Sequence, residues 1–551
     1  MGEVMGFIRR GGSRPLGDAE AARRRGEWMA AAANYRSHLA RAPGDAAARN
    51  DLGIVLCELG DFTAAQEQFE SAIAADAGLA SAHLNLGHLC MRRQAYREAL
   101  GCYLRVLEID PGQAEARGQA ALAHYELGEV RQALALLDAD CESDLLHGEY
   151  SLFITNAFAG HDPAAHAQAH RRWGDLLEST APPPRVRSAA AAGSTPRKIR
   201  IGYVSADFRE HAVARFLLPV FEGHDRSSFD VFCYANQAGE DAITAAIRCM
   251  PLEWRAIHAL DDAAAADLIA ADGIDILIDL SGHTRGNRLG VFARQPAPLQ
   301  ASWLGYLNTT GMKSIRYRIS DSAMDPAGLS DVSHSESLLR LDPAGWCYRA
   351  PVEAPEVSPA PGDARGYVTF GSFNHVAKLN DRVLECWSGI LESCPDSRLN
   401  MVGIPDAATA ARLRRNFLDR GIGEERISLL PRLPRTEFLR AMADVDIALD
   451  PFPYCGGATT CESLWMGLPV IALAGDFGFA RSSAAILAQA GFAEFVTDSP
   501  ENYVRKAVDL AATGVQGHRQ AMRDTMRTSA LMDEAAFVRR LEDAYRRIIA
   551  A

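Results

Sequence analysis

The chain lacks the marks of a membrane, secreted or nucleic-acid-binding protein. Its apolar runs are short and interrupted by charges, which excludes a transmembrane helix of about 20 apolar residues. The N-terminus does not follow the order of a signal peptide, namely a basic start, an apolar core and a small cleavage site. A net charge of −13 argues against a broad basic face for nucleic acid. We therefore expect a cytoplasmic protein with neither a membrane nor a nucleic acid among its partners.

Paired cysteines are missing as well. The eleven cysteines, an odd number, are scattered from Cys57 to Cys461, and none forms a Cys-x-x-Cys pair. This distribution favours neither a disulfide framework nor a zinc site, so we expect reduced thiols. No other cluster of metal-ligating residues is visible in the sequence. We therefore expect neither a metal nor another cofactor.

What the chain does have is length and an ordinary globular composition. At 551 residues, with 48% apolar and 23% charged residues, it is long enough for about three or four domains.

The first third repeats with a period of 34 residues. The recurring positions are Pro43, Ala77 and Pro111; Gly53, Gly87 and Ala121; Ala31, Ala65, Ala99 and Ala133; and Tyr35, Phe69, Tyr103 and Leu137. This is the tetratricopeptide pattern, in which pairs of antiparallel helices stack into a solenoid. We predict an α-solenoid over 25–142 after an N-terminal segment, 1–24, with a generic helical bundle as the alternative. Its concave face suits polypeptide partners, and the repeats are also a candidate homodimer surface.

The remaining two thirds alternate between strand and helix patterns. A helical connector, 143–180, and a Pro/Ala-rich linker, 181–197, lead to a first domain over 198–350. A second linker, 351–366, leads to a second domain over 367–551. The expected strands are 198–205, 229–235, 274–280, 299–304, 367–373, 399–402, 426–430, 445–449 and 469–474. This order predicts two Rossmann-like, doubly wound domains with parallel sheets and a cleft between the carboxyl ends of their strands.

The run 450–465, DPFPYCGGATTCESLW, carries the strongest local signal. It follows a buried strand, passes through a Pro/Gly loop and begins a helix, with Gly456 and Gly457 allowing a ligand close to the backbone. Thr459 and Thr460 add hydroxyl groups where helix N–H groups are unpaired, and such a helix start binds anions. Glu462, one turn in, is placed to hold a ribose. The loop predicts a nucleotide diphosphate site, with an ordinary capped helix as the alternative.

Five motifs in the second part of the chain carry a family resemblance. They are 201–211 (IGYVSADFREH), 279–288 (DLSGHTRGNR), 296–306 (PAPLQASWLGY), 373–378 (FNHVAK) and the loop at 450–465. Together with the repeats they resemble the protein O-GlcNAc transferases and the related Spindly-type enzymes of glycosyltransferase family 41. The resemblance implies a GT-B pair of Rossmann-like domains behind the solenoid.

Three residues of the first domain are candidates for the acceptor side. His211 follows the first strand, where an imidazole can take a proton, and the resemblance implies a place at the active site as a base. Asp279 and His283 end a buried strand. Asp279 is expected to orient an acceptor or relay a proton, with a simple turn cap as the alternative, and His283 to contact sugar or acceptor.

The second domain supplies the candidate leaving-group and nucleotide contacts. Cleavage of a sugar–phosphate bond leaves negative charge on the diphosphate, which a lysine can stabilise, and the resemblance gives Lys378 this role. Asn374 and His375 are expected to line the same pocket. Arg435 and Phe438 lie where the family holds the uracil base.

The sequence departs from the better-known O-GlcNAc enzymes at four positions. Those enzymes carry histidine at the places of Phe438 and Ala458, and Pro-Gly where this chain has Leu307-Asn308. Nearby, Tyr306, Thr309 and Thr310 are expected close to the sugar or acceptor.

The sequence thus predicts an inverting, metal-independent protein glycosyltransferase that moves GlcNAc from UDP-GlcNAc to Ser or Thr. The alternatives are transfer of glucose from UDP-glucose to Asn, transfer of fucose from GDP-fucose to Ser or Thr, and a non-catalytic repeat scaffold with a degenerate transferase domain.

Overall fold

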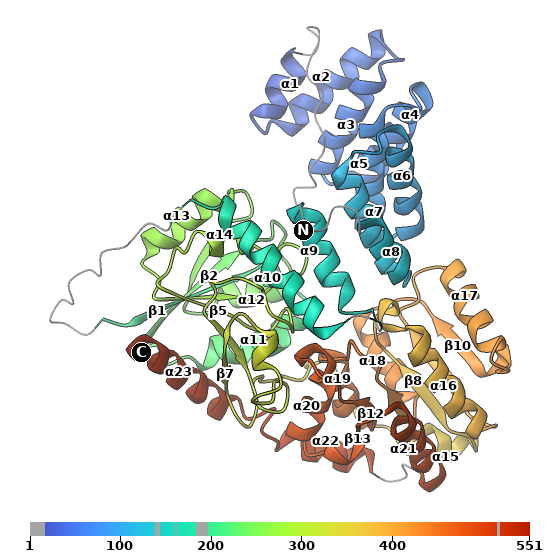
Figure 1. Ribbon diagram of the computed structural model, residues 1–551. Helices are drawn as coiled ribbons and strands as arrows, with labels where there is room; N and C mark the ends of the chain where they lie inside the picture. The colour runs from blue at the N-terminus through green and yellow to red at the C-terminus, as the bar shows by residue number, and fades with distance from the viewer. Residues whose placement is uncertain (1–16, 138–143, 159, 161, 183–196, 515–517) are drawn as a thin grey trace. The chain divides into compact units, whose positions relative to one another are not determined.

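The computed structural model describes residues 17–137, 144–158, 160, 162–182, 197–514 and 518–551 (Figure 1). The described residues form two compact units, which divide between residues 151 and 152. The predicted N-terminal segment, 1–24, is described from residue 17 onward. Of the predicted linker 181–197, residues 183–196 lie outside the described part of the chain.

The first unit is an array of antiparallel helix pairs. Its helices are α1 (Gly17–Arg24), α2 (Trp28–Arg41), α3 (Ala46–Glu58), α4 (Phe62–Ala75), α5 (Ala80–Arg92), α6 (Tyr96–Ile109), α7 (Ala114–Glu126) and α8 (Val130–Leu137). A Cβ on Gly53 would lie 2.5 Å from the Phe69 ring, and one on Gly87 would lie 2.6 Å from the Tyr103 ring. The recurring small residues are therefore where an aromatic side chain of the next helix packs. This confirms the predicted repeat fold.

Two helices follow the repeats and lead to the sheets. They are α9 (Leu145–Thr155) and α10 (Pro163–Thr180). Asp162 caps α10 by accepting a hydrogen bond from the Ala164 amide at 3.0 Å, and Pro163 occupies the first helical position.

The first sheet has seven parallel strands in the order β3-β2-β1-β4-β5-β6-β7. The strands are β1 (Ile199–Ser205), β2 (Phe229–Ala235), β3 (Glu253–Ala256), β4 (Ile276–Asp279), β5 (Leu299–Ser302), β6 (Tyr317–Ser320) and β7 (Ser337–Arg340). The helices between them are α11 (Ala212–Gly223), α12 (Ala242–Arg248), α13 (Asp262–Asp272) and α14 (Leu289–Ala293).

The second sheet has six parallel strands in the order β10-β9-β8-β11-β12-β13. The strands are β8 (Thr369–Ser372), β9 (Arg398–Val402), β10 (Ile427–Leu430), β11 (Ile447–Leu449), β12 (Val470–Leu473) and β13 (Val496–Thr497). Its helices are α15 (Pro361–Arg365), α16 (Asp381–Ser393), α17 (Ala407–Leu418), α18 (Arg435–Ala443), α19 (Ala458–Trp465), α20 (Ser482–Gln489), α21 (Pro500–Thr513) and α22 (Arg519–Arg527). Two parallel, helix-covered sheets confirm the predicted pair of Rossmann-like domains.

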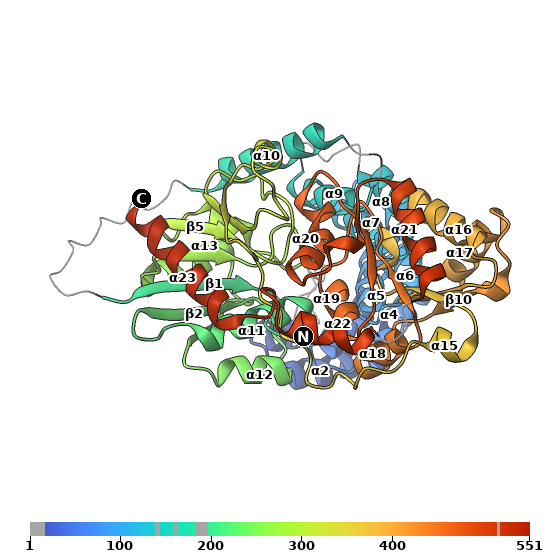
Figure 2. The same ribbon diagram turned by 90° about the horizontal axis from the view of Figure 1, so that it is seen from below.

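The last helix, α23 (Glu534–Ala550), returns to the first sheet. It packs on α11, as both views show (Figures 1 and 2). The hydroxyl groups of Tyr203 and Tyr545 lie 3.1 Å apart, and Glu542 lies 3.0 Å from Nδ1 of the buried His224. The final helix is therefore part of the core of the first domain.

No helix among the described residues combines the length and the apolar character needed to cross a membrane.

Candidate functional site

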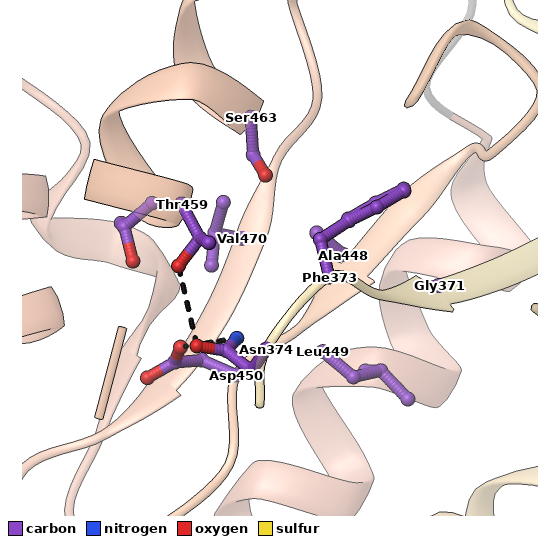
Figure 3. A pocket seen from close by; sticks show the side chains of 10 residues that line it. Gly371, Phe373, Asn374, Ala448, Leu449, Asp450, Thr459, Ser463 and Val470 are labelled. Atoms are coloured by element: carbon purple, nitrogen blue, oxygen red, sulfur yellow. Dashed lines mark hydrogen bonds between the residues drawn. The ribbon is translucent and has the colours of Figure 1, made fainter. Parts of the chain in front are cut away.

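A series of side-chain hydrogen bonds holds the loop between β11 and α19. Because β8 and β11 are paired parallel strands, Asn374 and Asp450 follow them at the same edge of the sheet. Asp450 Oδ1 accepts hydrogen bonds from the Gly456 amide at 2.9 Å and from Asn374 Nδ2 at 3.3 Å. Thr459 donates its hydroxyl to Asn374 Oδ1 at 3.2 Å, so that Asn374 lies between Thr459 and Asp450 (Figure 3). A cavity of only about 10 Å³ remains here, so the loop is packed closely on the strand ends.

Gly456 is the glycine that the loop cannot replace. A Cβ there would lie 2.6 Å from Thr460 Oγ1 and 2.7 Å from both Asp450 Oδ1 and Thr459 Oγ1. At Gly457 the nearest atom would be 3.8 Å away on Trp346, an ordinary contact. Gly456 therefore permits the close packing, whereas a Cβ at Gly457 would make only an ordinary contact.

Lys378 reaches this loop from the turn after β8. Its ammonium donates to the Cys455 carbonyl oxygen at 2.7 Å and lies 4.3 Å from the centre of the Tyr454 ring. Burial lowers the pKa of Lys378, and the charge of Asp450 opposes that shift. Lys378 thus bonds to the same loop that Asn374 holds through Asp450 and Thr459, and a diphosphate contact of these residues stays a prediction. His375 lies beside them and caps the same turn by accepting from the Ala377 amide at 3.2 Å.

Glu462 is a buried carboxylate in an ion pair. It lies 2.6 Å from the Arg435 guanidinium, which also lies 3.5 Å from Glu353. Burial raises the pKa of Glu462, and Arg435 opposes the shift. Phe438 packs edge-on against Phe373, with ring centres 5.7 Å apart. The residues that were predicted to contact the ribose and the base therefore lie in α18 and α19.

Thr460 faces the loop from the other side. Its hydroxyl lies 2.9 Å from that of Ser483, which also donates to the Gly456 carbonyl oxygen at 2.9 Å. Ser482 donates to the same oxygen at 2.8 Å. The first turn of α20 thus fixes the loop in place.

His211 lies after β1 as the N-cap of α11, and 41% of its side chain is exposed. Its Nδ1 accepts from the Val213 amide at 3.4 Å and lies 3.6 Å from Asp207. Desolvation lowers the pKa of His211, and Asp207 opposes the shift. Because Nδ1 accepts here, the neutral ring carries its proton on Nε2. Nε2 can act as a base only in the other tautomer, in which the proton is on Nδ1 and points to Asp207.

Asp279 and His283 are buried, whereas the contact with sugar or acceptor that was predicted for them needs an accessible side chain. The Asp279 carboxylate accepts from the Ser281 and Gly282 amides at 3.1 and 2.8 Å, which is the turn cap named as its alternative role. Burial raises the pKa of Asp279 to about 6. His283 lies 2.9 Å from the Thr310 carbonyl oxygen through Nε2, and its ring packs 4.5 Å from that of Trp173. Both residues are almost fully buried.

The residues predicted near the sugar are also interior. Thr309 and Thr310 have no exposed surface, and their hydroxyls donate to Glu336 at 2.6 and 2.5 Å. The Tyr306 hydroxyl lies 2.8 Å from His170 Nε2 and 3.0 Å from the side-chain amide of Asn156. These contacts fasten α10 and the residues before it to the first sheet. A contact between these side chains and a sugar stays a prediction, because it requires a local rearrangement.

The buried histidine His170 of α10 predicts a loss of stability in acid. Burial lowers the pKa of His170 from 6.5 to about 4, so its contribution is complete above pH 6.5 and is lost as the pH falls toward 4. The shift corresponds to about 3 kcal/mol at most. Urea unfolding between pH 7 and 4.5 should show this loss in the native chain and a smaller one in His170→Gln. An equal pH dependence in His170→Gln and in the control His83→Gln would contradict the assignment.

Sequence reasoning missed the residues that support the site. Asp450, Ser483, Glu336 and His170 all bond to predicted site residues. The only sequence signal among them was Asp450, which directly follows a buried strand. The other contacts depend on tertiary structure.

Two family models match the chain. Glycosyl transferase family 41 matches residues 183–343 and 359–541. The tetratricopeptide repeat matches 16–80, 51–114 and 84–144.

Several known proteins are similar to this one. A protein of Oryza sativa subsp. japonica, named as the probable UDP-N-acetylglucosamine–peptide N-acetylglucosaminyltransferase SPINDLY, is 38% identical over 390 residues, which are 69% of this chain and 42% of that protein. The Arabidopsis thaliana protein named as the probable UDP-N-acetylglucosamine–peptide N-acetylglucosaminyltransferase SEC is 30% identical over 63% of this chain and 37% of its own length. The chain thus spans about two fifths of these relatives. The structure of a mutant O-GlcNAc transferase of Thermobaculum terrenum superposes with a TM-score of 0.72 at 33% identity, covering 97% of this chain and 96% of that one.

Proposed function

The chain belongs to glycosyl transferase family 41, and from this premise we propose that it transfers a sugar from a nucleotide diphosphate to a polypeptide. The observation that carries the proposal is the position of Lys378. Its amine bonds to the loop at the start of α19, where helix amides also favour negative charge. A leaving diphosphate needs this combination of a cation and oriented N–H groups.

The proposed reaction is a single displacement with inversion. The acceptor oxygen bonds to the anomeric carbon as the bond from that carbon to the diphosphate oxygen breaks, and the electron pair leaves with the diphosphate. Lys378 and α19 stabilise its charge, while Glu462 holds the ribose. The proton of the acceptor passes to a base, for which His211 is the candidate. No metal is part of the proposal.

UDP-GlcNAc is the proposed donor, with Ser or Thr as the acceptor. The names of the relatives, which are those of UDP-N-acetylglucosamine–peptide N-acetylglucosaminyltransferases, support it. UDP-glucose with Asn and GDP-fucose with Ser or Thr are the other candidates, because Phe438 and Ala458 differ from the histidines of the better-known enzymes. The repeats are proposed to hold the polypeptide in a cytoplasmic enzyme and to offer a surface for a homodimer.

A donor screen tests the function. The full chain is incubated with UDP-GlcNAc, UDP-glucose or GDP-fucose and with a mixture of soluble cellular proteins, and the released nucleotide is measured with and without EDTA. We expect release from UDP-GlcNAc, at an equal rate with EDTA. Release from GDP-fucose alone would overturn the donor, and loss of activity with EDTA would overturn the metal-free mechanism.

Thermal stabilisation separates the enzyme from a non-catalytic scaffold. A nucleotide that binds the folded state at many times its dissociation constant raises the unfolding temperature. We expect millimolar UDP to do so. A chain that neither UDP nor GDP stabilises, and that releases no nucleotide, would be the scaffold.

A further inference from the structure

Asp450 is the first residue of the loop between β11 and α19 and supports the site from beneath Gly456 and Asn374. The residue is 2% exposed and directly follows β11. A buried carboxylate is costly unless its oxygens are paired. Here one oxygen accepts from both Gly456 and Asn374, which lie on different segments. Asp450 therefore joins the loop to the turn that carries Lys378.

A carboxylate also fixes the direction of the hydrogen bonds around it. An ionised carboxylate only accepts, so Asn374 has to present its NH₂ group to Asp450. The amide oxygen of Asn374 is then turned toward Thr459 and accepts that hydroxyl. With a neutral residue at position 450, the amide of Asn374 could turn over and the order would be lost.

Asp450 and Lys378 each stabilise the charged form of the other. Burial raises the pKa of Asp450 to about 6, and Lys378 opposes the shift. In return, Asp450 keeps the pKa of Lys378 from falling further. The other titratable groups beside Asp450 are Cys455 and Tyr503, whose hydroxyl donates to the Asp450 carbonyl oxygen at 3.0 Å.

We propose that Asp450 is a positioning residue, which orders the Thr459–Asn374 hydrogen bonds and the Gly456 amide so that α19 and Lys378 meet a nucleotide diphosphate. The inference rests on the proposed function and deepens it. It makes the ionised carboxylate a requirement for tight nucleotide binding, although its own charge repels a diphosphate. Ordering outweighs repulsion because Lys378 and two N–H donors offset that charge.

The test compares UDP binding by the full native chain and by Asp450→Asn, using calorimetry between pH 5 and pH 8. The ratio of the two dissociation constants is the readout, because the titration of UDP itself cancels in it. We expect Asp450→Asn to bind about tenfold more weakly at pH 8, the loss of one charged hydrogen-bond partner. The ratio should approach one near pH 5, where the native carboxyl is protonated and resembles the amide.

The control is Asp446→Asn. Asp446 is also buried, and it accepts from the Thr369 and Gly362 amides at 2.8 Å, away from the loop. It should lower the unfolding temperature and leave the UDP ratio near one at every pH. A structural role alone would give Asp450→Asn the same result.

Two outcomes overturn the proposal. One is a ratio that does not change with pH, and the other is tighter binding by Asp450→Asn, which would mean that repulsion dominates. If Asp450→Asn does not fold, Asn374→Ala serves instead, because it removes the side chain that links Thr459 to Asp450. It should weaken UDP binding about threefold at pH 8. Unchanged binding would overturn the proposal. Failure of the native chain to bind UDP or GDP would instead refute the proposed function.

Discussion

Replacement of Lys378 by methionine is expected to lower turnover by about 100- to 1,000-fold while nucleotide binding changes less than tenfold. The methionine keeps most of the length of the side chain and removes the charge that lies 2.7 Å from the Cys455 carbonyl oxygen. That charge matters most when the bond to the diphosphate breaks, because the leaving oxygen then becomes more negative. The measurement is nucleotide release at saturating donor, with UDP binding measured by calorimetry.

The matched control is Lys198→Met. Lys198 pairs with Asp230 at 3.3 Å on the surface, and both side chains are more than 40% exposed. Its replacement should leave turnover unchanged, because exposed pairs contribute little. Turnover of Lys378→Met equal to that of the control would refute the assignment of Lys378 to the leaving group.

Replacement of Glu462 by alanine is expected to weaken UDP binding by about 30- to 100-fold, which corresponds to the loss of charge-assisted hydrogen bonds to the ribose. The carboxylate is already desolvated and oriented by Arg435 at 2.6 Å, so little ordering remains to be done when a ribose binds. The measurement is the dissociation constant of UDP and of its 2′- and 3′-deoxy forms.

The deoxy nucleotides make this prediction specific. One of them should bind the native chain weakly and should lose no further affinity with Glu462→Ala, since the hydroxyl and its partner are then both absent. Glu353→Ala removes the other carboxylate beside Arg435 and serves as the control, because it leaves the ribose partner in place. Equal losses for UDP and both deoxy forms with Glu462→Ala would place Glu462 outside the ribose site.

The sequence predicted the repeats and the central strands because both are local patterns. It missed β3, β6, β7 and β13. Of these, β3, β7 and β13 are short strands at the edges of their sheets, where one side faces solvent and no apolar run is required. In β6 the obstacle is Arg318, which is buried and donates to the Tyr306 and Asn308 carbonyl oxygens. A charged residue interrupts the apolar run by which an interior strand is predicted from sequence.

In the candidate site, too, contiguous residues could be predicted and contacts between distant residues could not. The loop from Gly456 to Glu462 could be predicted because its helix start and small residues are contiguous. The contact of Asn374 with Asp450 spans 76 positions and that of His170 with Tyr306 spans 136, and neither is visible in one sequence. For Asp279 the residue was found and the fold adds its cap of the Ser281 and Gly282 amides, but its role toward an acceptor stays a prediction, because burial is a property of the fold.

The packing of α23 on α11 has a consequence for biosynthesis. Tyr203 and Tyr545, which meet in the core of the first domain, are 342 positions apart. A ribosome adding about 5 to 20 residues per second needs tens of seconds to make the intervening chain. During that time β1 and α11 are complete but lack the helix that covers them. The apolar face of α11 that α23 covers thus lacks its cover until the whole second domain has emerged.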